Sequence, residues 1–520
     1  MDAVSKTDPR DAQLAVQAEQ ITAQAAALAA RDEALIAQAE TLAARDAALI
    51  AQAAELTLQK AEISELTARV AALTDTVRTL LEAQKRNSNN SNLPPSSDPP
   101  GSAGDVAKRK PKGKRRKRGG QRGHRGSHRR LLPPEKVDEF VDIFPHHCEN
   151  CWQPLPEISD LYARRYQHTE LQPLQPHVTE YRRHAVVCPS CGSKTRAAYD
   201  ALVIPKFAFG PRFMSVVALL TGVYHLSRRQ SAQPIWELLG VRISVGSISA
   251  IERRVSDAVQ PFIEELWSSA MHAPVKHTDG TSWLQTGVML SLWTVATAAV
   301  TVFKILPNSQ RVTLQTEVLT RLQGILVSDR ATALTFWAMD KRQICWAHLL
   351  RKFVSFSERD GPAGLLGKEL LDATRILFVY WADFKNGVLS RTQFMMRMAP
   401  LRSLIEATLN RGVNANIKGL SGSCANILEH RLALWTYVDH EGVEATNNHA
   451  ERELRAFVLW RRRSFGTRSD RGNRFAERLM TIAHTARKQA KSVLGFLVAC
   501  CTRSDADAPP SLLAPALQPV

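Results

Sequence analysis

The sequence lacks the features of a secreted or membrane-spanning protein. Its first residues are polar, with no basic segment followed by an apolar one, so we expect no signal peptide. The uncharged run over residues 286–303 is rich in Thr and β-branched residues and is barely long enough to cross a bilayer. We therefore expect paired β-strands there, no membrane partner and a cytoplasmic location.

Cysteine is scarce, and acidic residues are outnumbered by basic ones. The 520 residues include 8 Cys, and 68 Lys and Arg stand against 50 Asp and Glu, a formal net charge of +18. Few cysteines and no secretion signal indicate a reducing compartment, where paired Cys bind metal more often than they form disulfides. The positive charge favours polyanionic partners but does not identify one. A chain of this length exceeds one core, so several domains are expected.

Residues 1–86 are predicted to form a coiled coil. An apolar residue recurs at every seventh position from Leu14 to Val77. A second seam position becomes apolar late in the run, at Leu66, Leu73 and Leu80. Ile or Val at the first position with Leu at the second favours a parallel dimer. We expect one helix over residues 10–85 that forms a homodimer; a solitary Ala-rich helix is the alternative.

Residues 87–135 have the composition of a disordered basic linker. Asn, Ser and Pro come first and cannot form a core. A dense basic segment follows, which includes Lys114, Arg115, Arg116, Lys117 and Arg118. Such an arm neutralises phosphates and gives salt-sensitive, sequence-independent binding to DNA. A solubilising tail or a sorting signal is the alternative.

Two C-x2-C motifs predict a zinc ribbon over residues 136–204. The paired thiols are Cys148 with Cys151 and Cys188 with Cys191. Two such pairs complete a tetrahedral site for structural Zn²⁺. The segment between the pairs is longer than usual but suits a ribbon with β-strands between its knuckles. Four unrelated thiols are the alternative.

Residues 205–268 are predicted to be helical and to contain a helix-turn-helix-like DNA-binding domain. The first helix should end at Gly240, and Ser244 should cap the second. Three residues of the second helix would face inward: Ile248, Ile251 and Val255. Four would face a DNA groove: Ser247, Ser249, Arg253 and Arg254. An ordinary helical hairpin is the alternative.

Three acidic residues stand where strands and a helix are expected to meet. Asp279 lies between two β-like runs, Asp329 ends another apolar run, and Glu451 opens an amphipathic helix. A central sheet would bring the first two together, with Glu451 on a helix packed against it. Three carboxylates can hold two Mg²⁺ (or Mn²⁺) ions about 4 Å apart, an arrangement that cuts and joins DNA.

Each acid also has a purely structural interpretation. Asp279 with Gly280 is a common hairpin-turn dipeptide. Asp329 could cap the helix that follows it. Glu451 stands at capping-box spacing from Asn448. Their joint placement after a zinc ribbon and a basic arm favours catalysis.

Other residues near the acids are candidates for DNA contacts. Arg455 lies one helical turn after Glu451 and would contact a phosphate or pair with that carboxylate. Arg461 and Arg462 belong to a second basic segment with interleaved aromatics, which could line a DNA channel; a solvated helix end is the alternative.

Cys345 and His348 would share one helix face, and the further ligands that a metal would need cannot be named from the sequence. We expect a buried Cys345 and a His348 hydrogen-bonded near the site. A helical insertion is expected at about 355–440; it contains Trp381 and Trp435, which we assign to core packing rather than to stacking on a base.

The ordered set of motifs resembles the bacterial transposases of the insertion sequence 66 family. The zipper, the linker, the Gly- and Arg-rich segment 119–126 and the C-x2-C knuckles are followed by Asp-x-Thr, Ser-Asp, Cys-Trp-Ala-His and Asn-Asn-His-Ala-Glu-Arg. They occur in the order of that family and span nearly the whole chain except about the last 25 residues. One position departs from the pattern: the residue after the first Asp, commonly Glu in the family, is Gly280.

The resemblance implies a multidomain protein with an α/β RNase H-like catalytic core over residues 269–490, followed by a C-terminal tail at 491–520. Its implied activity is metal-dependent DDE transposition, with Asp279, Asp329 and Glu451 as the catalytic acids. Implied partners are double-stranded DNA, namely the terminal inverted repeats and the target, and accessory proteins of the same element, in a bacterial nucleoid. The alternatives are a non-catalytic zinc-finger and leucine-zipper DNA-binding protein, a decayed transposase, and a nuclease that cuts without joining.

Overall fold

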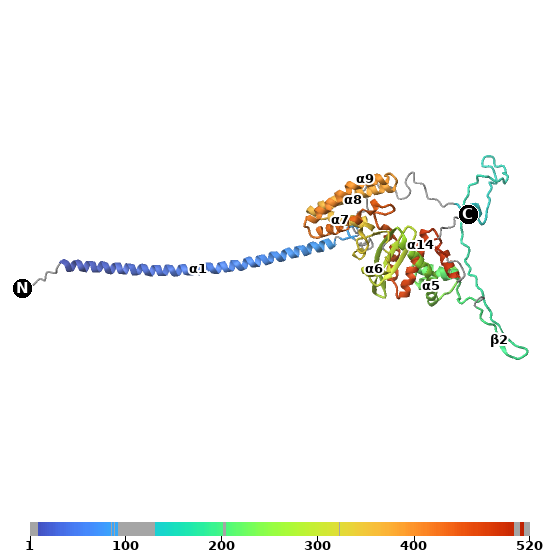
Figure 1. Cartoon of the computed structure of the whole chain (residues 1–520), viewed down its shortest axis with the longest axis horizontal. Coiled ribbons are helices and arrows are strands. Elements are labelled where there is room, and N and C mark those ends of the chain that lie inside the picture. Colours follow the sequence, from blue (N-terminus) through green and yellow to red (C-terminus); the bar gives the residue numbers. More distant parts are fainter. Residues whose placement is uncertain are drawn as a thin grey trace, which may run out of the picture. The chain divides into compact units, whose positions relative to one another are not determined.

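The chain forms two compact units, Met1–Asn87 and Ser88–Val520. The computed structural model describes residues 9–84, 86–87, 89–91, 131–200, 204–321, 323–503 and 510–513. The basic segment Lys114–Arg118 lies outside the described residues, so its predicted contact with DNA stays a prediction. The described part of the chain is mostly helical, with one mixed sheet and a long N-terminal helix (Figure 1).

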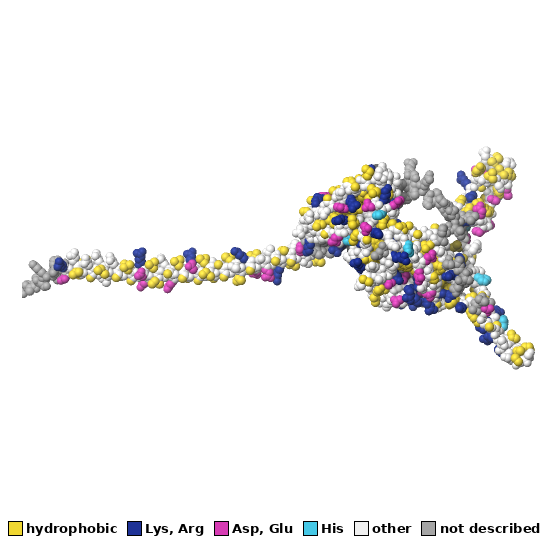
Figure 2. Space-filling view, viewed as in Figure 1, with side chains coloured by type: hydrophobic (Ala, Val, Ile, Leu, Met, Phe, Trp, Pro, Cys, Tyr) yellow, Lys and Arg dark blue, Asp and Glu magenta, His cyan; other side chains and the backbone are white. Residues whose placement is uncertain are grey.

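The first unit is a single helix, α1 (Pro9–Gln84), which confirms the predicted helix over residues 10–85. Its heptad residues are exposed: Leu14 is 62% accessible, Ile63 63% and Leu73 64%. Figure 2 shows hydrophobic side chains along its length. Exposed apolar side chains at this spacing are what a second helix would bury. The predicted homodimer is consistent with this surface and stays a prediction.

The second unit is built around a five-stranded sheet with the order β5-β4-β3-β6-β7. Its strands β3, β4 and β5 are antiparallel neighbours, whereas β6 pairs parallel with β3 and β7 parallel with β6. The strands are β3 (Val275–Gln285), β4 (Val288–Ala296), β5 (Thr301–Leu306), β6 (Ile325–Ser328) and β7 (Arg342–Ile344). The uncharged run therefore forms paired strands, as predicted. No helix among the described residues is long and apolar enough to span a membrane.

Helix α14 (Asp470–Lys488) covers the outer edge of the sheet. Three of its side chains accept hydrogen bonds from N–H groups of β5: Glu477 from Ile305 (2.6 Å), Thr481 from Phe303 (3.2 Å) and Thr485 from Thr301 (3.1 Å). Residues two apart on a strand and four apart on a helix are spaced by about 6–7 Å in both cases, so the two series match. The edge strand is thereby protected from pairing with another chain.

Helices α4 (Arg228–Leu239) and α5 (Val245–His272) form the predicted helical pair. Gly240 ends α4 in the left-handed conformation at φ 65°, and the Ser244 hydroxyl accepts the Ser247 N–H, both as predicted. The three residues predicted to face inward are buried: Ile248, Ile251 and Val255. They belong to one core with the sheet and with α14, so the packing shows no break at residue 268.

Of the four residues predicted to face DNA, Arg253 is exposed and the other three are half-buried. The Arg471 guanidinium of α14 donates hydrogen bonds to the hydroxyl and carbonyl oxygens of Ser249, so this part of α5 faces protein. The guanidinium of Arg254 lies 3.2 Å from the centroid of the Phe207 ring. Ser247 is half-buried beside Ser244. The prediction for Ser249 was wrong because it packs against α14, about 220 residues further along the chain, and the residues around Ser249 do not indicate that contact.

The segment predicted as a helical insertion is helical, and its being an insertion in a catalytic core stays a prediction. Trp435 is 1% exposed and its indole N–H donates to Glu406 at 2.9 Å. Trp381 packs against Tyr437 with ring centroids 5.2 Å apart. Both Trp therefore serve the core, as predicted. The helices of this region are α7 (Trp346–Ser357), α8 (Gly361–Lys385), α9 (Arg391–Asn414), α10 (Ser421–Glu429), α11 (Arg431–Leu434) and α12 (Thr436–Asp439).

The segment predicted as a C-terminal tail contains helix α15 (Val493–Thr502), in which Phe496, Leu497 and Cys500 are buried in the same core as α5. The apolar face of α15 explains this difference from a tail. The remaining elements are short helices and a hairpin: the 3-10 helices Pro134–Lys136, Thr332–Leu334 and Met339–Lys341, the π-helical turn Leu219–Val223, α3 (Pro211–Ala218), α6 (Arg311–Glu317), α13 (Asn448–Ser464), β1 (Ala185–Val187) and β2 (Lys194–Arg196).

Candidate active site

The register of the sheet places Asp279 and Asp329 side by side. Asp279 lies within β3, and Asp329 directly follows β6. The two strands are parallel, with His277 opposite Val327. Continuing this register by two residues puts Asp329 beside Asp279. The hairpin-turn interpretation of Asp279 is wrong, because the β3–β4 turn is formed by Thr286 and Gly287, both at positive φ.

Glu451 reaches the sheet from the first turn of α13. Asn447 anchors this helix: its side-chain amide donates to the Thr278 carbonyl at 2.8 Å, and its backbone N–H donates to Cys345 Sγ at 3.1 Å. Asn447, not Asn448, is the N-cap, and it makes no side-chain cap. Among the described residues, Oε1 of Glu451 has no hydrogen-bond partner. The capping-box interpretation of Glu451 is therefore wrong.

The three carboxylates affect each other's charge. Burial and, to a smaller extent, the negative charges of Asp329 and Glu451 together raise the pKa of Asp279 to about 8, while the Gly280 N–H and the Arg351 charge oppose the shift. Repulsion between these acids is consistent with their lying near one another in the fold. Their oxygens are not all within 4.8 Å of one another in the described chain.

One oxygen of each Asp is held by a backbone N–H. Asp279 Oδ1 accepts from Gly280 and Asp329 Oδ1 accepts from Ala331, each at 2.9 Å. Asp329 is not the cap of the short helix that follows, since that N-cap is Ala331. These bonds fix the two side chains while the second oxygens remain available. Anionic oxygens are the ligands that Mg²⁺ and Mn²⁺ prefer, so the donor set fits paired divalent ions.

Three arginines near the acids were not predicted from the sequence. Arg342 is fully buried and donates to the Asp329 carbonyl at 3.0 Å. Arg330 donates to Asn426 at 3.1 Å, and Arg351 lies on α7. Burial lowers the pKa of Arg342 to about 10, and the Asp329 charge opposes that effect. These positive charges partly offset the acids, and only the folded chain brings them together.

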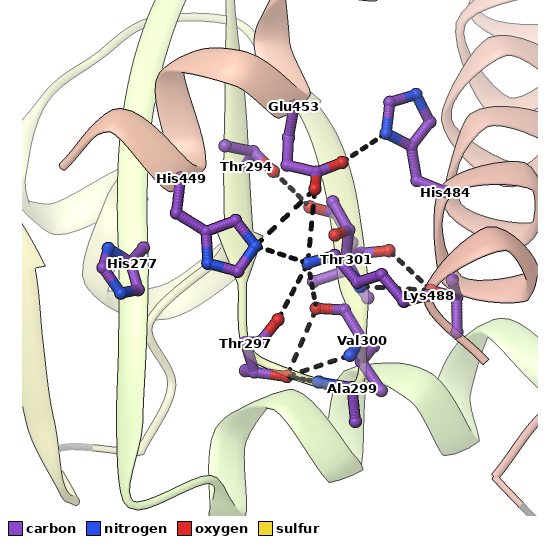
Figure 3. A network of polar contacts seen from close by, with 12 residues as sticks. His277, Thr294, Thr297, Ala299, Val300, Thr301, His449, Glu453, His484 and Lys488 are labelled. Carbon is purple, nitrogen blue, oxygen red and sulfur yellow. Dashed lines mark hydrogen bonds and ion pairs between the residues drawn. The ribbon is translucent and has the colours of Figure 1, made fainter. Parts of the chain in front are cut away.

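Behind the site, a polar network joins α13 to α14 (Figure 3). Glu453 is bonded to His484 and lies 3.3 Å from the Lys488 ammonium. His449 lies 2.8 Å from that ammonium and packs beside His277 of β3, with ring centroids 5.0 Å apart. Burial would raise the pKa of Glu453, but the hydrogen bonds from the two histidines and the Lys488 charge hold it well below its usual value. The network fixes α13, and so Glu451, against the sheet.

The packing of Trp293 explains why the residue after Asp279 is Gly280, where the family commonly has Glu. A Cβ atom built there would lie 2.7 Å from the Trp293 ring, closer than real side chains approach. Trp293 is 5% exposed, so its ring has little room to move. This chain has no space for a side chain directly after Asp279, and the three acids are unaffected.

Cys345 is fully buried, as expected, and His348 lies beside the site. His348 Nδ1 is 3.8 Å from Glu451 Oε1, beyond hydrogen-bond distance, and has no hydrogen-bond partner in the described part of the chain. The expected hydrogen bond of His348 is therefore not made through this nitrogen. Together Cys345, His348 and Glu451 form a possible metal-ligand group.

The basic residues predicted on α13 differ in their surroundings. Arg455 is exposed, and no ion pair joins it to Glu451 in the described structure. Arg461 is bonded to the backbone and hydroxyl oxygens of Ser282 on β3, which holds it against the sheet. Arg462 is exposed. Contacts of these arginines with DNA stay predictions.

The two Cys pairs adopt one backbone geometry. In each knuckle the first Cys donates its N–H to a carbonyl five residues on and accepts from an N–H four residues on, all at 2.9 Å. The partners are Gln153 and Trp152 for Cys148, and Ser193 and Gly192 for Cys188. Backbone N–H groups also lower the thiol pKa of Cys148 and Cys188. This geometry suits metal thiolates.

The structure does not bring the sulfur atoms of the two knuckles into one metal-ligand group among the described residues. No three of their sulfur atoms lie within 4.8 Å of one another in the described chain. The segment between them has highly exposed apolar side chains, such as Leu161 at 97% and Tyr162 at 90%. A segment without an apolar core needs another source of stability, and a structural metal is one. The predicted zinc ribbon stays a prediction.

Two family models match parts of the chain. A family model described as "Family of unknown function" matches residues 5–130. None of the curated proteins matches the chain. A family model described as "Transposase IS66 family" matches residues 206–474, which is more than half of the chain and includes all three acids. The chain therefore belongs to the IS66 family of transposases.

Proposed function

We propose that this transposase is a DDE enzyme that cuts and joins DNA with divalent metal ions held by Asp279, Asp329 and Glu451. The observation that carries the proposal is the parallel register of β3 and β6, which sets two acids side by side while Asn447 directs the third toward them. The strand order β5-β4-β3-β6-β7, with Asp279 on the central strand β3 and Asp329 directly after the neighbouring strand β6, supports an RNase H-like core.

The three acids would act as ligands of the ions. Paired Mg²⁺ or Mn²⁺ ions, when bound, activate a water or a 3′-hydroxyl and stabilise the leaving oxygen. Asp279 must give up its proton to become a ligand, because burial and its two acidic neighbours raise its pKa to about 8. The N–H groups of Gly280 and Ala331 hold the two aspartates in place, which limits the reorganisation needed on binding.

The other parts of the chain would bind and pair the DNA ends. Arg253 on α5 and Arg455 on α13 are exposed and suited to phosphate contacts. The basic segment Lys114–Arg118 would add sequence-independent affinity. Zn²⁺ would draw the Cys148 and Cys188 knuckles together, and α1 would dimerise the protein. The bound sequence would be the terminal inverted repeat of the element.

A strand-transfer assay on end DNA tests the catalytic assignment. Asp279→Asn, Asp329→Asn and Glu451→Gln should each reduce transfer by more than 100-fold while end binding is retained. Asp372→Asn is the matched control, because Asp372 is an exposed acid on α8 that pairs with Arg375 in the described structure. Transfer that survives at the wild-type rate in Asp279→Asn and Glu451→Gln would refute the assignment.

The same assay separates the alternative functions. A wild-type protein that binds ends but yields no product after Mg²⁺ is added is a non-catalytic DNA-binding protein. Cleaved but unjoined product identifies a nuclease. Zinc is tested by metal analysis: we expect one Zn²⁺ for the four knuckle thiols, and its loss in Cys148→Ser.

A further inference from the structure

A second group of possible metal ligands shares Glu451 with the catalytic acids. Cys345 offers its sulfur, His348 a ring nitrogen and Glu451 a carboxylate oxygen, and these three atoms lie within 4.8 Å of one another. Among the described residues, no other set of three or more Cys, His, Asp and Glu side chains meets this condition. Asp279 and Asp329 are not part of it.

Two of the three ligands have buried atoms without a hydrogen-bond partner in the described chain. His348 Nδ1 and Glu451 Oε1 are inaccessible to solvent and form no hydrogen bond within the described chain. They lie 3.8 Å apart, too far for a hydrogen bond. Buried polar atoms are nearly always satisfied, and unsatisfied ones call for an explanation such as an ion. A cation between them would satisfy both.

The third ligand, Cys345, is placed to bind as a thiolate. Its sulfur accepts the Asn447 N–H at 3.1 Å, and the residue is the N-cap of the 12-residue helix α7, where the helix dipole favours negative charge. Burial raises the pKa of the Cys345 thiol to about 11, so the free protein keeps the proton. On binding, the sulfur–hydrogen bond is replaced by a sulfur–metal bond and the proton leaves to solvent.

The ligand types and spacing select the metal. Sulfur with imidazole and carboxylate suits Zn²⁺ and similar soft ions, whereas Mg²⁺ requires oxygen ligands. Ligand atoms around a tetrahedral Zn²⁺ are roughly 3.3–3.8 Å apart at the usual bond lengths. For a nitrogen and an oxygen ligand the lower value applies, so the 3.8 Å between His348 Nδ1 and Glu451 Oε1 would shorten by about 0.5 Å on binding.

We propose that Cys345, His348 and Glu451 form a binding site for a soft divalent cation such as Zn²⁺, and that its occupation withdraws Glu451 from Asp279 and Asp329. The ion would then inhibit the Mg²⁺-dependent reaction without occupying the position of the catalytic ions. Inhibition rests on the proposed function; binding of the soft ion does not.

Co²⁺ titration of the full-length protein tests the site. One equivalent of Zn²⁺ is added first: the four knuckle thiolates should bind it more tightly than a group of three ligands, and Co²⁺ displaces it poorly. The wild type should bind one more Co²⁺ than Cys345→Ser and show sulfur-to-cobalt charge-transfer absorption that this variant lacks. His348→Gln and Glu451→Gln should weaken Co²⁺ binding at least tenfold. Cys424→Ser is the matched control, because Cys424 is also buried but belongs to no ligand group in the described chain, and it should bind like the wild type.

Equal Co²⁺ stoichiometry and equal charge-transfer absorption in the wild type and in a folded Cys345→Ser would overturn the proposal. If Cys345→Ser does not fold, as judged by circular dichroism, His348→Gln decides: unchanged Co²⁺ affinity overturns the proposal, and at least tenfold weaker binding supports it.

The second measurement is inhibition of strand transfer by Zn²⁺ at constant Mg²⁺, with each variant compared to its own rate without Zn²⁺. The wild type and Cys424→Ser should be inhibited at a Zn²⁺ concentration at least tenfold lower than Cys345→Ser. Equal inhibition of all three overturns the regulatory part. The two proposals fail separately. If Asp279→Asn loses strand transfer but the wild type and Cys345→Ser bind Co²⁺ equally, only the soft-metal site is refuted. If the wild type binds the extra Co²⁺ but has no strand-transfer activity, only the catalytic assignment is refuted.

Discussion

Replacing Asp279 by Asn should stabilise the metal-free protein. In the folded chain burial and the charges of Asp329 and Glu451 raise the pKa of Asp279 from 3.8 to about 8. The folded state therefore keeps a proton that the unfolded state releases between these two pH values. Stability is thus greatest at low pH and is lost as the pH rises from about 4 to about 8. Asn has nearly the same shape and does not titrate.

The size of the effect follows from the same shift. Each pH unit between the two pKa values corresponds to about 1.4 kcal/mol. From pH 5.5 to pH 7.5 the metal-free wild type should lose up to about 3 kcal/mol of unfolding free energy through this carboxyl. At pH 7 the variant should exceed the wild type by up to about 4 kcal/mol. These values are ceilings, because the three acids share their protons.

The assay is urea unfolding of the Mg²⁺-free full-length protein, followed by Trp fluorescence, at pH 5.5 and 7.5. Titrating groups outside the three acids act alike in both proteins, so the difference between wild type and Asp279→Asn isolates this group of acids. Asp372→Asn is the control and should follow the wild type. Mg²⁺ should restore stability to the wild type at pH 7.5 but not to Asp279→Asn. The reasoning fails if the wild type and Asp279→Asn show the same dependence on pH and on Mg²⁺.

Three further predictions concern the groups that position the site. Asn447→Ala removes the side-chain hydrogen bond from α13 to the β3 backbone and should lower the unfolding free energy, measured in urea, by about 1–3 kcal/mol. It should also reduce strand transfer at least tenfold at a temperature where the variant is fully folded. Unchanged transfer would contradict this. Glu453→Gln leaves Lys488 buried without its carboxylate partner and should lower the unfolding free energy by about 3 kcal/mol; a loss below 1 kcal/mol would show that the network is not a stabilising one. Gly280→Ala should cost about 1–3 kcal/mol through its clash with Trp293, and Trp293→Leu in the same chain should recover part of that loss; no recovery would mean that the ring is not the obstacle.

The sequence by itself determined the elements that depend on neighbouring residues. The heptads predicted α1 to within one residue at each end. Gly240 and Ser244 marked the end of α4 and the start of α5, because a left-handed cap and an N-cap are local requirements. The acids could be identified since each one stands at the edge of a strong strand or helix pattern.

Only the tertiary structure decided how these elements meet. The pairing of β3 with β6 sets Asp329 beside Asp279, and no residue near either acid specifies that register. Packing of α14 directed Ser249 toward protein instead of DNA. Arg342 is buried in the three-residue strand β7, which is too short to show an alternation of apolar and polar residues in the sequence.

The neighbourhood of Glu451 shows the same limit most clearly. The spacing of Cys345 and His348 indicated a shared helix face, but their partner lies about 100 residues further along the chain. Asn447 brings it there through bonds to β3 and to Cys345 itself. Local spacing can specify caps, heptads and knuckles, because their atoms are close in sequence. Contacts between distant segments depend on the packing of the whole core, which is why the ligands around Glu451 became visible only in the folded chain.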